Sequence, residues 1–155
     1  MCNLTCPCGK NDYAVCCEPF HLGQKTAQNA EELMRSRYSA FAKHNIDYLV
    51  KTTALGQQPH LDVPAIRQWS LQNKWQKLEV IQHVAQVNKH HALVEFKAYY
   101  HDGIKDQEHH ESSYFVFYQN QWYFLDPTLT FMPSMKHPCI CGSGKKYKHC
   151  CASFL

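Results

Sequence analysis

The spacing of apolar side chains divides the chain into a helical first half and a strand-rich second half. Over residues 30–44, apolar positions recur every three or four residues, which predicts an amphipathic helix. Asn29 and Glu32 have the spacing of a capping box at the start of this helix. Shorter helices are predicted over residues 46–53 and 62–71.

The second half of the chain follows the period of two that is typical of β-strands. Strands are predicted over residues 75–87, 91–101, 109–119 and 122–125. On the second of them, one face would carry Ala92, Val94, Phe96, Ala98 and Tyr100. Residues 18–28 are expected to be irregular. Helices followed by antiparallel hairpins predict an α+β fold in which the helices pack on one face of a curved sheet.

Length and charge indicate a globular protein. A chain of 155 residues can form one core domain with appendages, and a net charge of +3 does not by itself imply nucleic-acid binding. No apolar run approaches the roughly 20 residues that a membrane-spanning helix needs, and the first residues do not resemble a secretory signal. A cytoplasmic location is therefore expected. In that reducing compartment, closely spaced cysteines bind metal more often than they form disulfides.

Eight of the nine cysteines form two quartets of the same design, a Cys-x-Cys pair followed by two adjacent cysteines. Four thiolates in so short a segment can surround one Zn²⁺ at about 2.3 Å. The sequence therefore predicts two structural zinc ions, and Cys2 is left over. The predicted ligands are Cys6, Cys8, Cys16 and Cys17 in the N-terminal quartet, and Cys139, Cys141, Cys150 and Cys151 in the C-terminal quartet.

Three other uses of these cysteines remain as alternatives. Disulfides conflict with a reducing compartment, and adjacent cysteines bridge each other only with strain. Iron–sulfur clusters also use four thiolates, but usually at wider spacings. A nucleophilic cysteine would need a neighbouring base, which His149 could supply to Cys150. Zinc is the favoured interpretation.

Residues 139–151 read Cys-x-Cys-Gly-Ser-Gly-Lys-Lys-Tyr-Lys-x-Cys-Cys, a pattern that resembles the SEC-C motif, named for the tail of the SecA preprotein translocase ATPase. The resemblance implies zinc ligation by the C-terminal quartet, with Cys151 where the translocase commonly has His. In the translocase, this tail docks the chaperone SecB and the ribosome, so the resemblance also implies docking. The N-terminal quartet resembles the motif less closely, because Gly9-Lys10-Asn11-Asp12-Tyr13 replaces its core and one residue is missing.

The whole chain resembles the YchJ-like family. The resemblance is carried by residues 33–41, 47–52 and 121–126 together with the terminal cysteines. It implies a cone-shaped NTF2-like domain, with helices on a curved antiparallel sheet and a SEC-C motif at each end. The implied domains are residues 1–25, 26–134 and 135–155. The family carries no established activity, so the resemblance implies a fold and a metal rather than a reaction.

NTF2-like cones often enclose a pocket, and some members are isomerases or dehydratases. The matching segments would bring near such a pocket Arg35, Arg37, Tyr38, Asp47, Tyr48 and Asp126. Tyrosine and aspartate could serve as acid and base there, and arginine could hold an anion. The favoured alternative is structural: Arg37 pairs with Asp47 or Asp126, and Tyr38 fills the core. The histidines, including His91, are expected to be solvated surface groups.

The leading functional hypothesis is a docking or adaptor protein rather than an enzyme, because four thiolates leave no open coordination position on a zinc ion. The partner would be a chaperone, the translocation machinery or the ribosome, and its contacts would be Lys145, Lys146, Tyr147 and Lys148. One alternative is a pocket enzyme or small-molecule binder. Another is a nucleic-acid binder, with Tyr147 stacking on a base. Nothing in the sequence indicates an oligomeric state.

Overall fold

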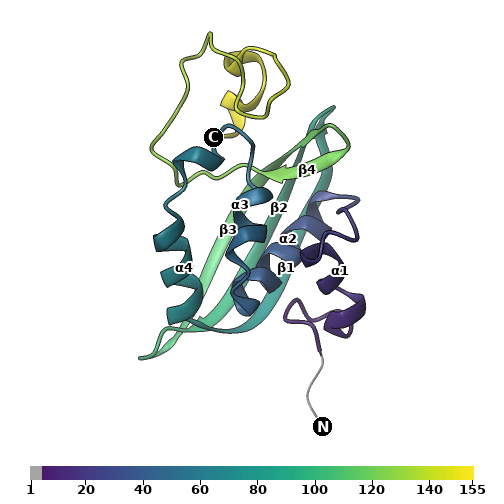
Figure 1. Cartoon of the computed structure of the whole chain (residues 1–155), viewed down its shortest axis with the longest axis vertical. Coiled ribbons are helices and arrows are strands. Elements are labelled where there is room, and N and C mark those ends of the chain that lie inside the picture. The colour runs from purple at the N-terminus through teal and green to yellow at the C-terminus, as the bar shows by residue number, and fades with distance from the viewer. Residues whose placement is uncertain (1–4) are drawn as a thin grey trace.

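A layer of helices covers one face of a four-stranded antiparallel sheet in the computed structural model, which describes residues 5–155. The strands lie in the order β1-β2-β3-β4, so each hairpin joins neighbours in the sheet. The N-terminal quartet lies beside α1 and α2, and the C-terminal motif caps the opposite end of the molecule (Figure 1). This confirms the predicted α+β fold. Cys2 lies outside the described residues.

The helices begin where the sequence places capping residues. The Asn29 side chain accepts a hydrogen bond from the Glu32 amide, and the Glu32 carboxylate reaches back to the amide of Gln28. Residues 18–28 contain a short helix that the sequence did not predict. Within the described residues, no helix is long and apolar enough to cross a bilayer. The helices are α1 Glu18–His21, α2 Ala30–Lys43, α3 Ile46–Lys51 and α4 Val63–Gln72.

The four predicted strands are present, with β1 and β3 two residues longer than predicted and β2 with the predicted bounds. The inward face of β2 carries Ala92, Val94, Ala98 and Tyr100, all of them buried, as predicted. Register shifts interrupt the pairing of β1 with β2 at three places, and such bulges bend and twist an edge strand. They account for the curvature of the sheet over the helices. The strands are β1 Lys74–Asn88, β2 His91–His101, β3 Asp106–Tyr118 and β4 Gln121–Phe124.

The buried side chains form two clusters, and each cluster contains one cysteine quartet. The larger lies between α2 and the sheet and includes Leu33, Leu49 and Phe115 with cysteines of the N-terminal quartet. The smaller joins Val116 and Leu125 to the C-terminal quartet and to Tyr147. Each terminal motif is therefore packed on a different part of the central domain.

Gly56 fixes how the C-terminal motif meets the central domain. Its amide donates to the Ile140 carbonyl at 2.7 Å, and a Cβ at this position would lie 2.8 Å from Ile140 Cα.

Gly56→Ala should therefore lower the unfolding free energy by about 1–3 kcal/mol, because a backbone atom must move to relieve the overlap. Thermal unfolding measures the loss. An unchanged melting temperature would show that the motif is not held at Gly56.

Candidate metal centres

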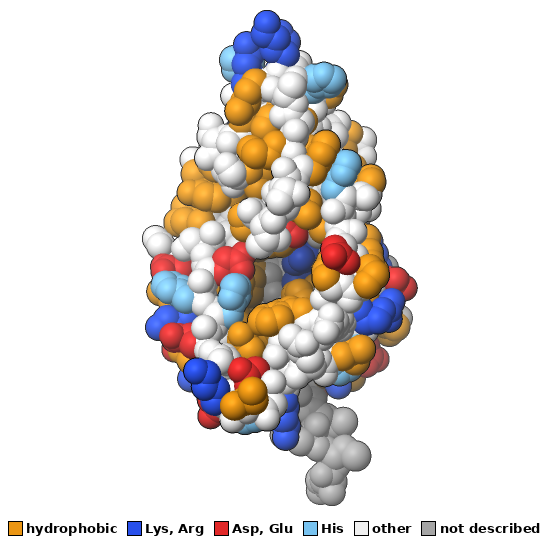
Figure 2. Space-filling model, turned by 90° about the vertical axis from the view of Figure 1, so that its left-hand side faces the viewer, with side chains coloured by type: hydrophobic (Ala, Val, Ile, Leu, Met, Phe, Trp, Pro, Cys, Tyr) orange, Lys and Arg blue, Asp and Glu red, His pale blue; other side chains and the backbone are white. Residues whose placement is uncertain are grey.

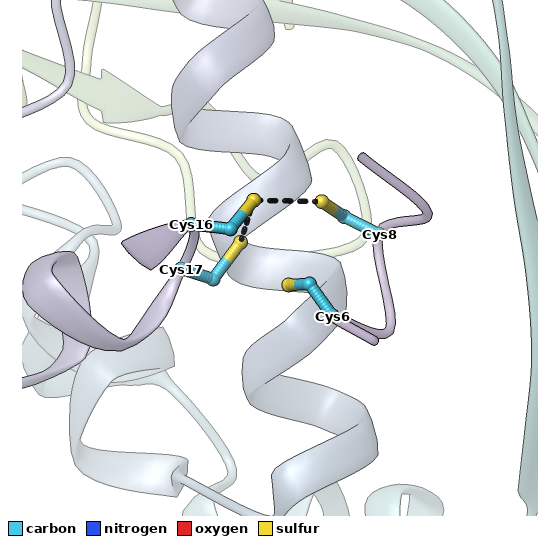
Figure 3. A group of neighbouring side chains, drawn as sticks. All are labelled: Cys6, Cys8, Cys16 and Cys17. Carbon is cyan, nitrogen blue, oxygen red and sulfur yellow. Dashed lines mark hydrogen bonds between the residues drawn. The ribbon is translucent and has the colours of Figure 1, made fainter. Parts of the chain in front are cut away.

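The N-terminal quartet is assembled by a short loop that folds back on itself. Thr5 bridges to Asp12, and between them the Gly9 amide donates to the Cys6 carbonyl at 2.9 Å, with Gly9 at φ 86°. This is a left-handed conformation that favours glycine. A 3₁₀ turn at Tyr13–Val15 then returns the chain to Cys16 and Cys17. In Figure 3, Cys8 points across the loop toward Cys16, with the two Sγ atoms 3.5 Å apart.

The C-terminal quartet is built in the same way. Pro138 bridges to Lys146, the Gly142 amide donates to the Cys139 carbonyl at 3.1 Å, and Gly142 has φ 90°. A 3₁₀ turn at Tyr147–His149 precedes the adjacent cysteines. The residue missing from the N-terminal copy falls between Gly9 and Asp12, inside the loop. The shorter loop therefore still presents four sulfur atoms.

The donor sets fit a tetrahedral metal ion. Within each quartet, all four sulfur atoms lie within 4.8 Å of one another. The Sγ atoms of Cys141 and Cys150 are 3.6 Å apart, and those of Cys150 and Cys151 are 3.8 Å apart. Four thiolates at about 2.3 Å from a zinc ion have sulfur separations of about 3.8 Å. All eight cysteines are free thiols, so each quartet can hold one metal ion.

The thiols perturb one another strongly. Hydrogen bonding with Cys17 lowers the pKa of Cys6, and the same contact raises the pKa of Cys17. In the C-terminal quartet, hydrogen bonding with Cys139 lowers the pKa of Cys141 and raises that of Cys151. Neighbouring sulfur atoms thus cannot all ionise unless a cation compensates them. A bound divalent ion supplies that charge.

Besides Ser143 of the C-terminal loop, whose Oγ lies 3.8 Å from Cys150 Sγ, two polar side chains of the central domain contact the sulfur atoms. Ser39 Oγ, on the buried face of α2, donates to Cys17 Sγ at 3.2 Å and lies 3.3 Å from Cys6 Sγ. His91 Nε2 lies 3.3 Å from Cys151 Sγ, and Asn88 Oδ1 holds Nδ1 at 2.9 Å. Such neighbours orient metal ligands. The expectation that His91 is a solvated surface group is wrong, since the residue is 2% exposed.

Sequence comparison places the chain in a family. A family model described as the middle, NTF2-like domain of YchJ matches residues 29–127, and a SEC-C motif model matches residues 135–153. A UPF0225 protein of Actinobacillus succinogenes is 47% identical over 151 residues, which cover 97% of both chains. The chain belongs to the YchJ-like, UPF0225 family. A UPF0225 protein of Haemophilus influenzae (strain PittEE) is 45% identical, covering 97% of this chain and 93% of that protein.

Solved structures agree with this assignment to the YchJ-like family. The crystal structure of a SEC-C motif containing protein from Psychrobacter arcticus has a TM-score of 0.90 and 43% identity, and covers 99% of this chain and 98% of that one. The solution structure of a SEC-C motif containing protein from Rhodopseudomonas palustris has a TM-score of 0.72 and 33% identity, and covers 79% of this chain and 95% of that one. The NTF2-like fold and the C-terminal SEC-C motif are therefore shared with proteins of known structure.

The six pocket candidates do not converge on one site. Arg35 binds the Glu31 carboxylate and the Cys8 carbonyl at the N-terminal loop, and Asp47 is exposed on α3. The Tyr48 hydroxyl is hydrogen-bonded to the Ser36 hydroxyl, with the two oxygens 2.6 Å apart. The arrangement of these residues gives no acid–base pair.

The remaining candidates lie closer to the sheet. Tyr38 fills the core, as the structural alternative predicted, and meets Trp75 edge to face. The Asp126 carboxylate caps its own loop by accepting from Thr128. The predicted ion pair of Arg37 with Asp47 or Asp126 is wrong, because no such pair forms among the described residues.

The basic loop of the SEC-C motif is exposed, but its tyrosine is not. Lys145, Lys146 and Lys148 are exposed, whereas Tyr147 is fully buried among the cysteines. The prediction that Tyr147 stacks on a nucleic-acid base is therefore wrong. The hydroxyl group of Tyr147 has no hydrogen-bond partner, so packing rather than polarity holds the ring in place.

His91→Ala should weaken metal retention at the C-terminal quartet about 10- to 100-fold and leave the N-terminal quartet unchanged, because only Cys151 loses a polar neighbour. Titration with a chromophoric chelator would then resolve one weakened site and one unchanged site. His90→Ala is the matched control, since this adjacent histidine forms no hydrogen bond with a sulfur atom of residues 5–155. A loss equal to that of the control would contradict the role given to His91.

Proposed function

We propose that this protein is a zinc-binding docking protein, in which each cysteine quartet holds one structural Zn²⁺ and the SEC-C motif presents a basic surface to a protein partner. The observation that carries the proposal is the construction of the C-terminal motif. A buried, closed set of four sulfur atoms lies under a loop whose lysines are exposed. A closed tetrahedral shell has no free position for a substrate, so a structural metal fits better than a catalytic one.

The lysines are fixed relative to the metal ligands. The Lys145 carbonyl accepts from the Cys139 amide at 2.7 Å, and the Lys148 amide donates to the Met135 carbonyl at 3.0 Å. A charged surface whose backbone is held in this way binds an oppositely charged partner with little loss of conformational entropy. The expected partner surface is acidic, and a chaperone, the translocation machinery or the ribosome could provide it.

The two motifs form separate surfaces. They lie toward opposite ends of the long axis of the molecule (Figure 1) and belong to different buried clusters. The N-terminal motif exposes apolar side chains, Val15 at 70% and Leu22 at 61%, in place of the row of lysines. We therefore assign docking to residues 135–155 and a stabilising role to residues 1–25, with residues 26–134 as the scaffold.

Protein purified under reducing conditions should contain two zinc ions per chain, measured by inductively coupled plasma mass spectrometry. Cys151→Ser should release one ion and leave α2 and the sheet folded, because only the smaller buried cluster contains Cys151. Circular dichroism and amide proton spectra check the fold. A zinc content well below two in the unmodified chain would contradict the two-site proposal.

Docking can be tested by reversing the charge of the exposed lysines. Lys145→Glu, Lys146→Glu and Lys148→Glu together should weaken binding to purified ribosomes or to a purified SecB-type chaperone at least about tenfold, with the loss largest at low salt. The matched control carries the same change at exposed lysines of β1 and of the β2–β3 turn, Lys74, Lys77 and Lys105. Equal loss in both variants would show that total charge, and not the SEC-C surface, governs binding.

A further inference from the structure

The concave side of the sheet contains a buried arginine without a carboxylate partner. Arg37 lies on the inward side of α2, is 9% exposed and forms no ion pair within the described chain. Its guanidinium lies 4.3 Å from the centre of the Phe124 ring. A buried charge normally needs a partner, so an unpaired arginine in an interior requires an explanation.

Among the described residues, hydrogen bonds reach one of the three guanidinium nitrogens, Nη1. Arg37 Nη1 donates to the Leu49 carbonyl at 2.8 Å and to the hydroxyl groups of Thr52 at 2.6 Å and Thr53 at 3.4 Å. Nε and Nη2 make no hydrogen bond within residues 5–155. These two nitrogens are without a partner but are not fully shielded from solvent, so both border space that solvent can enter. The contacts of Nη1 hold the group in place and leave the other edge free.

The free edge has the geometry of a carboxylate receptor. The N–H groups of Nε and Nη2 point in parallel, and this side of a guanidinium binds the two oxygens of a carboxylate together. Burial lowers the pKa of Arg37 to about 10, so the group stays charged at neutral pH. The free N–H groups are therefore strong donors in a partly desolvated place.

Figure 2 shows that this side of the molecule is hollowed. The face at the left of Figure 1, where α4 lies beside the sheet, opens inward, and atoms of a Lys or Arg side chain lie in the hollow next to hydrophobic side chains. Partly buried apolar residues line the helix–sheet interface from both sides, Val63 and Ile66 from α4 and Phe96 from β2. The surroundings favour a ligand with an apolar body.

A carboxylate on the inward face of the sheet is held by its own neighbours. Glu111, on the inward face of β3, accepts from His109 at 2.7 Å and from the Ser113 hydroxyl. Burial opposes its ionisation, but these hydrogen bonds outweigh the effect of burial and lower the pKa of Glu111. Glu111 attracts Arg37 without touching it, and so does Asp126 from the loop after β4. Because Coulomb energy falls with distance, both repel an anion less than Arg37 attracts it.

We propose that the free edge of Arg37 faces this hollow and binds a small organic carboxylate with an apolar body, whose two oxygens accept from Nε and Nη2. Glu111 limits the affinity by its negative charge. The site is separate from both metal centres, so a YchJ-like protein of this kind combines a docking motif with a ligand-binding cone.

Benzoate is the probe, and nuclear magnetic resonance is the measurement. Added to the full zinc-loaded chain, benzoate should shift the Arg37 Nε–H signal and nearby amide signals in a saturable way. Acetate carries the negative charge but no aromatic ring, and benzyl alcohol carries the aromatic ring but no charge. Both should bind at least about tenfold more weakly than benzoate. Benzyl alcohol binding as tightly as benzoate would overturn the assignment of Arg37 as the anchor.

Two variants test the charges. Arg37→Lys removes the paired donors and should weaken benzoate binding at least about tenfold. Glu111→Gln keeps one acceptor oxygen, replaces the other by an NH2 group that can donate to the Ser113 hydroxyl, and removes a negative charge. It should tighten binding about threefold. Glu108→Gln is the matched control, because Glu108 lies on the outer face of the same strand, paired with Lys97 at 3.0 Å.

The Glu111 variant keeps the proposal testable if Arg37→Lys fails to fold, since the hydrogen bonds of Glu111 go to His109 and Ser113 of its own strand. The proposal is overturned if benzoate causes no saturable shift in the unmodified chain. It is also overturned if Glu111→Gln changes the affinity no more than Glu108→Gln does.

Discussion

Eight cysteine side chains lie in two groups in the folded chain, six of them buried, where thiolates need a compensating positive charge. The two terminal segments contain little regular structure and bury few large apolar side chains of their own. Their loops are held by tight turns at Gly9 and Gly142 that bring the cysteines together. A metal ion at each quartet would turn these loops into rigid bodies, and its binding free energy would become folding free energy.

The cysteine quartets are coupled to the central domain by polar contacts as well as by packing. Ser39 connects the N-terminal quartet to α2, the helix that also supplies Arg37. His91 connects the C-terminal quartet to the first residue of β2. The N-terminal quartet is therefore linked to the helical layer of the central domain, and the C-terminal quartet to its sheet. This arrangement explains why a SEC-C motif in this family can be part of the folded domain rather than a flexible appendage.

The sequence predicted what depends on local pattern. The apolar period of residues 30–44, the cap at Asn29 and the inward face of β2 specify elements that their own residues determine. The grouping of the cysteines into two quartets likewise follows from their spacing. The errors concern burial set by residues far away in the chain. His91 looked like a surface histidine because nothing near it in sequence shows that Cys151 packs on it. Tyr147 looked exposed among lysines, yet it is the side chain around which the basic loop closes.

Arg37 shows why a correct selection of residues did not give the correct interactions. The sequence marks it as a polar group on an otherwise apolar helix face, for which an ion pair is the simplest partner. The chain instead offers Nη1 the Leu49 carbonyl at the end of α3 and two threonine hydroxyls, which satisfy one nitrogen without neutralising the charge. A structural role alone would be met equally well by a neutral donor of the same reach. Arg37 instead keeps a full positive charge in a partly desolvated place, and its Nε and Nη2 donors are free. An anion that binds there explains this arrangement better than a contribution to the stability of the fold does.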